Sequence, residues 1–275
     1  MSEKVISREY KVMLYNELFA GDEQQLLKSA SQFWDVFSQA INNIVSNVDG
    51  DLEEIADKRL IRFYDTDEHM LYKNDYIFRE RQDTSTGERE VTLKFRHPDR
   101  YVAQDRNMEA GNAEGETKFE EDIKIPFSVL YSFSTTQKIP NNNNLNKLQD
   151  FAKLYPDLSD KLIPYKEEEK IKTVGRLTIR ELVIKGARFQ IKNNPRLDSK
   201  CALIVWYDNN GDDQKPIAVE FSFKYGDENE DYTRKMAQRA YDICHILQEK
   251  LTTWVDLKSD TKTAYIYKLD GFTNR

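Results

Sequence analysis

Four cationic side chains alternate with other residues in two neighbouring segments of the sequence. Arg79 and Arg81 lie two positions apart in the first segment, and Lys94 and Arg96 lie two positions apart in the second. A polar turn at residues 83–87 separates the segments, so the pattern predicts a β-hairpin. Successive side chains of a strand point to opposite faces, and each pair therefore shares a face. Four cations on one face repel each other unless acidic neighbours or a bound anion compensate them.

Further charged side chains fall within other predicted strands. The additional cations are Lys118, Arg176 and Arg180, and the carboxylates are Glu9, Glu120, Asp122 and Glu220. Two interpretations of this alternation are open. A sheet face in contact with solvent is the one that pattern alone favours. The other is a closed or nearly closed antiparallel barrel with a polar interior, in which cations bind phosphate oxygens and carboxylates hold a divalent metal.

Composition narrows the classes of protein to consider. The 275 residues include 41 basic and 48 acidic side chains, which gives a formal net charge of -7. This acidic balance disfavours binding to duplex nucleic acid, which depends on a cationic surface. The longest apolar run, residues 201–207, is far shorter than the roughly 20 residues of a membrane-spanning helix. The polar N-terminal segment lacks the apolar core of a signal peptide, so a cytoplasmic location and no membrane association are expected.

Several common active-site motifs do not occur. The sequence contains neither the GxxxxGK[ST] phosphate loop nor the GxGxxG dinucleotide turn. Its three histidines have no ligand-like spacing, and its two cysteines do not form a CxxC pair. Zinc enzymes, serine hydrolases and nucleotide-binding folds of these kinds are therefore not indicated.

Hydrophobic periodicity predicts a single α+β domain over residues 1–275, with about eight strands, most of them antiparallel. Strands are expected at 8–14, 60–64, 75–81, 88–96, 117–125, 176–184, 188–192, 201–207 and 217–225, with an edge strand at 263–269. Helices are expected at 22–45, 145–158 and 230–251, with a helical turn or two at 52–58.

Three central segments resemble the CYTH superfamily of triphosphate tunnel proteins, which includes class IV adenylyl cyclases, thiamine triphosphatases and inorganic triphosphatases. RFYDT at 62–66 is similar to the family's YYDT-like strand end, IFRER at 77–81 to its LRxR strand, and TLK at 92–94 to its TLK strand. Lys118, Glu120 and Asp122 look like the RxExE strand, and Glu220 like the start of the late ExE strand. The resemblance covers roughly residues 8–250, with elaborations near 22–46 and 138–170.

The resemblance implies an antiparallel β-barrel or tunnel of about eight strands with flanking helices. It implies that Arg79, Arg81, Lys94 and Arg176 bind phosphates, and that Glu120, Asp122 and Glu220 hold Mg²⁺ or Mn²⁺. Arg96, Lys118 and Arg180 join the phosphate-binding candidates from the strand pattern. The family's N-terminal ExExK motif falls on residues 9–13, which makes Glu9 and Lys11 the catalytic candidates.

Three positions depart from the family pattern. Lys11 replaces the second glutamate of ExExK, Met13 replaces its lysine, and Ser222 replaces the second glutamate of ExE. Fewer carboxylates and an added ammonium weaken binding of a hard divalent cation. The departures leave open whether the chain retains metal-dependent turnover.

Three functional hypotheses follow. The leading one is a triphosphate-binding tunnel that hydrolyses its ligand with Mg²⁺ or Mn²⁺, with adenylyl cyclase activity as a less favoured variant. The second is a catalytically inactive protein on the same scaffold that binds a polyphosphate or other small anion. The third is a structural role in which the helix containing Phe33, Trp34 and Phe37 docks a partner, although such stripes usually pack into the protein's own core. The sequence does not indicate the substrate or the oligomeric state.

Overall fold

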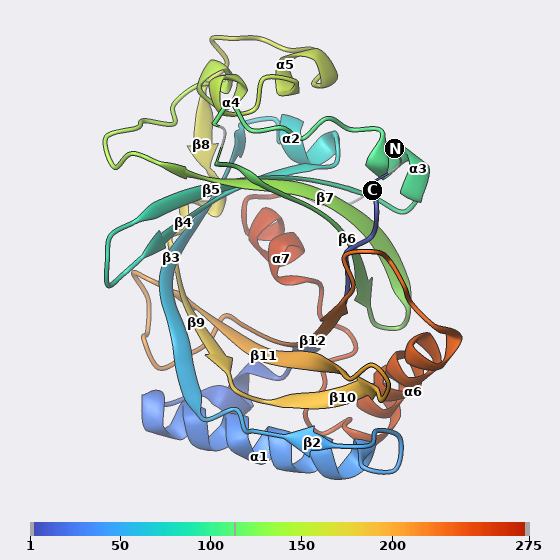
Figure 1. Ribbon diagram of the computed structural model, residues 1–275. Coiled ribbons are helices and arrows are strands. Elements are labelled where there is room, and N and C mark those ends of the chain that lie inside the picture. Colours follow the sequence, from blue (N-terminus) through green and yellow to red (C-terminus); the bar gives the residue numbers. More distant parts are fainter. Residues whose placement is uncertain (1–2, 113, 273–275) are drawn as a thin grey trace.

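Nine strands close into a barrel in the computed structural model, which describes residues 3–112 and 114–272 (Figure 1). Around the wall the order is β12, β1, β6, β7, β5, β4, β3, β9 and β11, which pairs again with β12. These strands are β1 (Ser7–Leu14), β3 (Glu54–Thr66), β4 (Tyr76–Asp83), β5 (Arg89–His97), β6 (Glu116–Lys124), β7 (Ser128–Ile139), β9 (Ile179–Lys185), β11 (Leu197–Asp208) and β12 (Ala218–Gly226). β1 and β6 run parallel, whereas the other neighbours along the wall are antiparallel. The predicted α+β barrel is confirmed, with one strand more than the expected eight.

Short strands and helices surround this barrel. β10 (Arg188–Lys192) and β2 (Val48–Asp49) extend the sheet from β11, and β8 (Ile171–Thr173) pairs with β3. The helices are α1 (Glu23–Ile41), α2 (Met70–Lys73), α3 (Arg100–Gln104), α4 (Leu148–Leu154), α5 (Leu158–Lys161), α6 (Arg234–Lys250) and α7 (Lys262–Leu269), with 3₁₀ turns η1 (Asn16–Phe19) and η2 (Val174–Arg176). Figure 1 shows α1 below the barrel, α4 and α5 above it, and α7 in its opening. Among the described helices, none has the length and apolar character needed to cross a bilayer.

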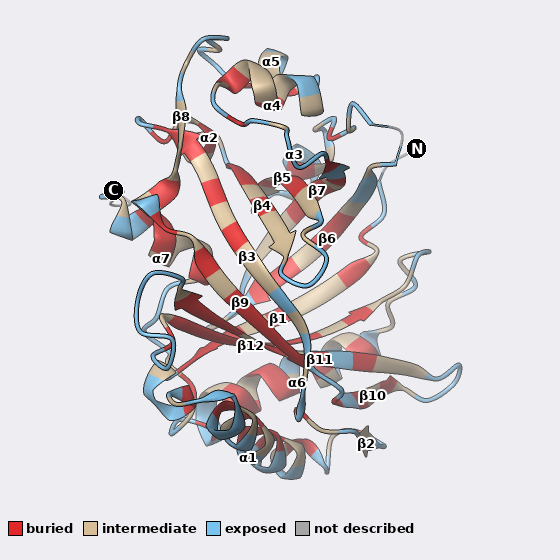
Figure 2. Cartoon of the chain, turned by 90° about the vertical axis from the view of Figure 1, so that its left-hand side faces the viewer, coloured by how far each residue is buried: buried red, intermediate tan, exposed pale blue. Residues whose placement is uncertain are grey.

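The two larger clusters of apolar side chains lie on the outside of the barrel, toward the helices, whereas a smaller cluster that includes Phe63, Ile179 and Trp206 lies on its inner side. In β1, Tyr10, Val12 and Leu14 are buried in a core shared with α1 and α6, while Glu9 and Lys11 point the other way. The alternation predicted for residues 8–14 is therefore confirmed. Figure 2 shows the same banding of buried and partly exposed residues along the upper half of β3. Because helices cover the outside of the barrel, its inner face is free to be polar.

The aromatic stripe of α1 belongs to the core. The helix begins after Asp22, whose side chain accepts a hydrogen bond from the Gln25 amide at 2.9 Å. Phe33 and Phe37 are fully buried and Trp34 is 3% exposed, so none of the three is available to a partner. Phe33 and Phe37 each pack edge-on against Phe221 of β12. The core-packing interpretation is confirmed, and this stripe offers no docking surface.

The segment near 138–170 covers the opposite side of the barrel. Phe151 of α4 stacks on Phe78 of β4 with ring centroids 3.6 Å apart. Tyr155 donates hydrogen bonds from its hydroxyl to the carbonyls of Val91 and Thr135, at 2.9 and 3.0 Å. Packing and hydrogen bonds thus attach this segment to the backs of β4, β5 and β7.

Two predicted elements were wrong, and one strand of the barrel wall was missed together with the short strands β2 and β8. Residues 54–58, expected to be helical, begin β3 by pairing with β9, and tertiary pairing outweighs their local preference. Residues 263–269, expected to form an edge strand, form α7, whose first turn is capped when Ala264 donates its amide to the Thr261 hydroxyl. β7 was missed because its inner face carries serine and threonine and gives no apolar alternation.

Candidate functional site

The inward side chains of the barrel line a cavity of about 310 Å³. Its charged wall contains eight cations and five carboxylates, so three positive charges are in excess. The cations are Lys11, Arg79, Arg81, Lys94, Arg96, Lys124, Lys224 and Lys262, and the carboxylates are Glu9, Glu120, Asp122, Glu181 and Glu220. We call this cavity the tunnel.

Strand register explains why the four hairpin cations meet in the tunnel. Arg79 pairs with Thr92, which places Lys94 and Arg96 of β5 on the same face as the arginines of β4. Ser134 and Ser132 of β7 lie opposite Lys94 and Arg96. Because these serines are small, they leave room for the long cationic side chains.

The guanidinium groups of this cluster are incompletely partnered. Within the described chain, the buried Nε atoms of Arg79, Arg81 and Arg96 have no hydrogen-bond partner, although Arg81 and Arg96 have carboxylates 3.9 and 3.5 Å away. Arg79 makes one long hydrogen bond, from Nη2 to the Thr92 hydroxyl at 3.4 Å. Burial, with a contribution from the Arg81 charge, lowers the pKa of Arg79 to about 9. The cluster holds cations at a cost that a bound anion would relieve.

Lys94 belongs to the same cluster. Burial, together with the nearby charges of Arg96 and Lys11, outweighs the opposing effect of Asp122 and lowers the pKa of Lys94 to about 8. The ammonium lies 3.7 Å from Asp122. A cation whose charged form is disfavoured by burial would be stabilised by phosphate oxygens.

A lysine bridges two carboxylates on the β1 side of the tunnel. Lys11 Nζ donates to Asp122 Oδ1 at 2.7 Å and lies 3.0 Å from Glu9 Oε2. Burial opposes the ammonium charge, but Asp122, Glu9 and Glu220 raise its pKa above the ordinary value. Burial likewise opposes the Asp122 carboxylate, but Lys11, Lys94 and Arg96 hold its pKa well below the ordinary value. Lys11 and Asp122 are therefore both charged at neutral pH.

The other two predicted metal ligands also pair with lysines. Glu120 accepts hydrogen bonds from the Lys224 ammonium and from the Ser7 hydroxyl. Burial raises the pKa of Glu120, but the charges of Lys94 and Lys224 outweigh burial and lower this pKa to about 2. Glu220 lies 3.2 Å from Lys262. Among the described residues, no group of three or more carboxylate, histidine or cysteine side chains is arranged to hold a metal ion. The residues present therefore do not fit the divalent metal that the resemblance implies.

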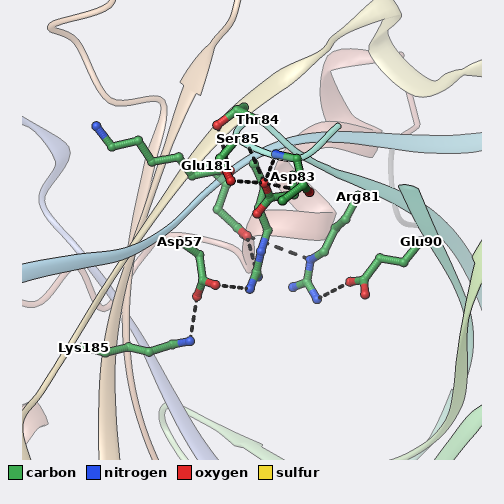
Figure 3. Close-up of polar contacts among 11 residues, drawn as sticks. Asp57, Arg81, Asp83, Thr84, Ser85, Glu90, Glu181 and Lys185 are labelled. Atoms are coloured by element: carbon green, nitrogen blue, oxygen red, sulfur yellow. Dashed lines mark hydrogen bonds and ion pairs between the residues drawn. The ribbon is translucent and has the colours of Figure 1, made fainter. Parts of the chain in front are cut away.

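An ion-pair network continues from the tunnel to its rim (Figure 3). Glu181 accepts a hydrogen bond from the Trp206 indole at 2.9 Å and lies 3.4 Å from Arg59 and 3.9 Å from Arg81. Asp57 then links Arg59 to the exposed Lys185, at 2.7 and 2.6 Å. The network holds Glu181 in place, and Arg81 lies between Glu181 and Glu90, at 3.9 and 3.7 Å.

Nine of the twelve predicted site residues line the tunnel: Glu9, Lys11, Arg79, Arg81, Lys94, Arg96, Glu120, Asp122 and Glu220. Three do not. Lys118 is 40% exposed and pairs with Glu116 near the start of β6. Arg176 lies in η2 with a positive φ of 52°, before β9 begins. Arg180 lies on the outer face of β9, where its guanidinium stacks on Tyr207 at 4.2 Å from the ring centroid.

Four charged tunnel residues were not predicted as site residues: Lys124, Glu181, Lys224 and Lys262. Glu181 is the inward residue of β9, and the adjacent Arg180 points out because strand neighbours face opposite ways. Lys224 continues the inward series from Glu220 and Ser222 along β12, so its spacing was a usable signal. Lys262 comes from α7, and no local pattern places a C-terminal helix at a tunnel mouth.

A larger hollow of about 1,250 Å³ lies outside the barrel, around α3 and the first described residues. Glu3, Asp99, Asp105, Glu109 and Glu228 line it, beside Lys4 and Arg106. Its open, acidic lining does not match any chemistry indicated by the sequence. The tunnel is the better candidate site.

No protein-family model matches the sequence, and no curated protein matches it. Among solved structures, the chain is similar to a "putative adenylyl cyclase" from Hippeastrum with a dominant triphosphatase activity, at 13% identity and a TM-score of 0.48, over 96% of this chain and 95% of that one. It is also similar to a "putative adenylate cyclase" from Bacillus halodurans, at 13% identity and a TM-score of 0.43, over 96% and 98% of the two chains. Identities this low leave the role of each residue to be judged from the tunnel itself.

Proposed function

We propose that the tunnel of this CYTH-like barrel binds a linear triphosphate or a longer oligophosphate. The observation that supports this most directly is the cluster of Arg79, Arg81, Lys94 and Arg96, with three buried guanidinium nitrogens that have no hydrogen-bond partner within the described chain. Guanidinium groups bind phosphate oxygens through charge-assisted, often bidentate hydrogen bonds.

Size and charge support a small polyanion. The cavity volume of about 310 Å³ falls at the lower end of ligand pockets, which span roughly 300–1,000 Å³. The cations lie on adjacent strands along the wall, so successive phosphates of one chain have donors within reach. A site enclosed in protein also strengthens these interactions relative to water.

Hydrolysis of the bound compound, which the resemblance implies, remains a prediction. The carboxylates that would assist it line the tunnel, but three of them pair with lysines rather than with one another. Binding is therefore the proposed function, and turnover is measured alongside it.

The test is calorimetric titration of the full chain with sodium tripolyphosphate, with orthophosphate as a matched probe. We expect tripolyphosphate to bind at least tenfold more tightly than orthophosphate, and Lys94→Glu to abolish binding because it inverts the charge at the centre of the cluster. Phosphate release from the same samples, with and without Mg²⁺ or Mn²⁺, reports turnover. Absence of tripolyphosphate binding in every condition would overturn the proposal.

A further inference from the structure

Three lysines occupy positions beside the carboxylates that the resemblance assigns to metal. Lys11 lies beside Asp122, Lys224 beside Glu120, and Lys262 beside Glu220. Each comes from a different element, β1, β12 or α7. An ammonium beside each carboxylate cancels the negative charge that would otherwise repel an anionic ligand.

The geometry at Lys11 resembles that of a bridging cation. Its Nζ lies 2.7 Å from Asp122 and 3.0 Å from Glu9, so one ammonium contacts carboxylates from β6 and β1. Lys11 faces Ser222 across the strand pair, and the small serine gives the lysine side chain room. Two of the three departures from the family pattern, Lys11 and Ser222, thus form one local arrangement.

Lys262 contributes from outside the barrel wall. α7 covers one end of the barrel (Figures 1 and 2), and Lys262 at its first position reaches Glu220 and lies 4.9 Å from the centroid of a Trp206 ring. Its side chain is only 10% exposed, which fixes the ammonium at the tunnel end. Aromatic and carboxylate contacts together stabilise this buried charge.

We infer that Lys11, Lys224 and Lys262 take the place of divalent metal, so that the tunnel binds the metal-free oligophosphate anion rather than its metal chelate. This inference rests on the proposed function. With the lysines present, the carboxylates are already neutralised, and a divalent ion entering the tunnel would have to displace an ammonium. A metal ion bound to the ligand would add positive charge, which the lysines and arginines of the tunnel already supply.

The test compares sodium tripolyphosphate binding in excess EDTA with binding in excess Mg²⁺. We expect affinity in EDTA to equal or exceed affinity in Mg²⁺. Binding only in Mg²⁺ would overturn this inference and leave the proposed function standing, whereas absence of binding in both conditions would overturn the proposed function.

Two variants test the lysines directly. Lys11→Glu restores the acidic residue of the family pattern, and we expect it to lower affinity at least tenfold in EDTA and to regain at least part of that loss in Mg²⁺. Lys224→Gln, at a partly exposed position, is expected to weaken binding in EDTA about three- to tenfold without disturbing the fold. The control is Lys138→Glu, which makes the same charge change as Lys11→Glu on an exposed lysine of β7 that pairs with Glu88. If both tunnel variants bind as the control does in EDTA, the lysines do not have the inferred role.

Discussion

Arg79 holds a positive charge in the tunnel wall without an ion-pair partner in the described chain, a state that costs folding free energy. Replacing such a charge by an apolar side chain of similar length often stabilises a protein. We expect Arg79→Met to raise the free energy of unfolding by about 1–2 kcal/mol and the melting temperature by roughly 2–8 °C. The same change should lower tripolyphosphate affinity at least tenfold. Thermal unfolding without ligand and calorimetry with ligand measure the two effects, and a loss of both stability and binding would contradict this account of Arg79.

Arg180 provides the comparison on the other face of the wall. The guanidinium contacts Tyr207 and donates to the Asp213 carbonyl at 2.7 Å, away from the tunnel. Arg180→Ala should therefore leave tripolyphosphate affinity within about twofold of the unmodified protein, as titration would show. Sequence could not exclude Arg180 from the site, since an error of one residue in a strand exchanges the two faces. The apolar neighbour Ile179 shares the inward face with Glu181, so hydrophobic alternation gives no clue to which face is polar.

At the scale of elements, Asp65 joins β3 to two helices. The fully buried carboxylate accepts hydrogen bonds from the amides of Thr66, Leu71 and Tyr72 at 2.8, 2.8 and 3.0 Å, and from the Tyr267 hydroxyl at 3.1 Å. Asp65→Ala would leave these donors unpaired and should lower the free energy of unfolding by about 3–6 kcal/mol. Asp65→Asn keeps one acceptor oxygen and should cost less than half as much. Denaturant unfolding of both variants measures the effect. An equal loss of unfolding free energy in the two variants would show that the carboxylate oxygens of Asp65 do not account for its contribution to stability.

The far end of α7 is attached through Asp270, which lies 2.7 Å from His69 and 3.1 Å from Lys172. Burial raises the pKa of Asp270, but the His69 and Lys172 contacts outweigh it, so the folded-state pKa is below the ordinary value. The contribution to stability is therefore present above the ordinary pKa of about 4 and is lost as pH falls through the folded value. We expect Asp270→Asn to cost about 1 kcal/mol at pH 7 and progressively less below pH 4. A difference between the two proteins that grows on acidification would contradict this sign.

The elements also show where prediction from sequence succeeds. β1, β4, β5 and β12 were predicted within a few residues because charged or polar side chains recur at every second position over part of each strand, and that alternation is imposed by the helix-covered outside and the polar inside. These four strands supplied seven of the nine predicted site residues that line the tunnel, and β6 supplied the other two, Glu120 and Asp122. β7 and α7 were not recognised as a strand and a helix. The inner face of β7 carries small side chains that leave room for the cations of β5, so it has no apolar alternation. The position of α7 depends on contacts with β3 and α2, which are far from α7 in the sequence.

At the scale of the whole molecule, an acidic protein encloses a cationic interior. The formal net charge is -7, whereas the tunnel wall has three cations in excess. Composition alone indicated an acidic surface. The pairing of the strands was needed to show which charged side chains meet inside the barrel. If the tunnel binds an oligophosphate as proposed, an enclosed cationic site under an acidic surface would select by shape, because a thin phosphate chain could enter while a duplex would meet mainly the acidic exterior.

This separation of charge predicts a selective effect of ligand on stability. Tripolyphosphate at one hundred times its dissociation constant should raise the free energy of unfolding by about 2.7 kcal/mol, and the melting temperature by roughly 5–10 °C. Duplex DNA at the same phosphate concentration should produce no shift, because the tunnel cations are out of its reach. Sodium chloride at matched ionic strength is the control for general screening of the cation cluster, and Lys94→Glu is the control for the site. Thermal unfolding measures all four conditions, and an equal shift with sodium chloride would mean that the tunnel responds to ionic strength rather than to a bound oligophosphate.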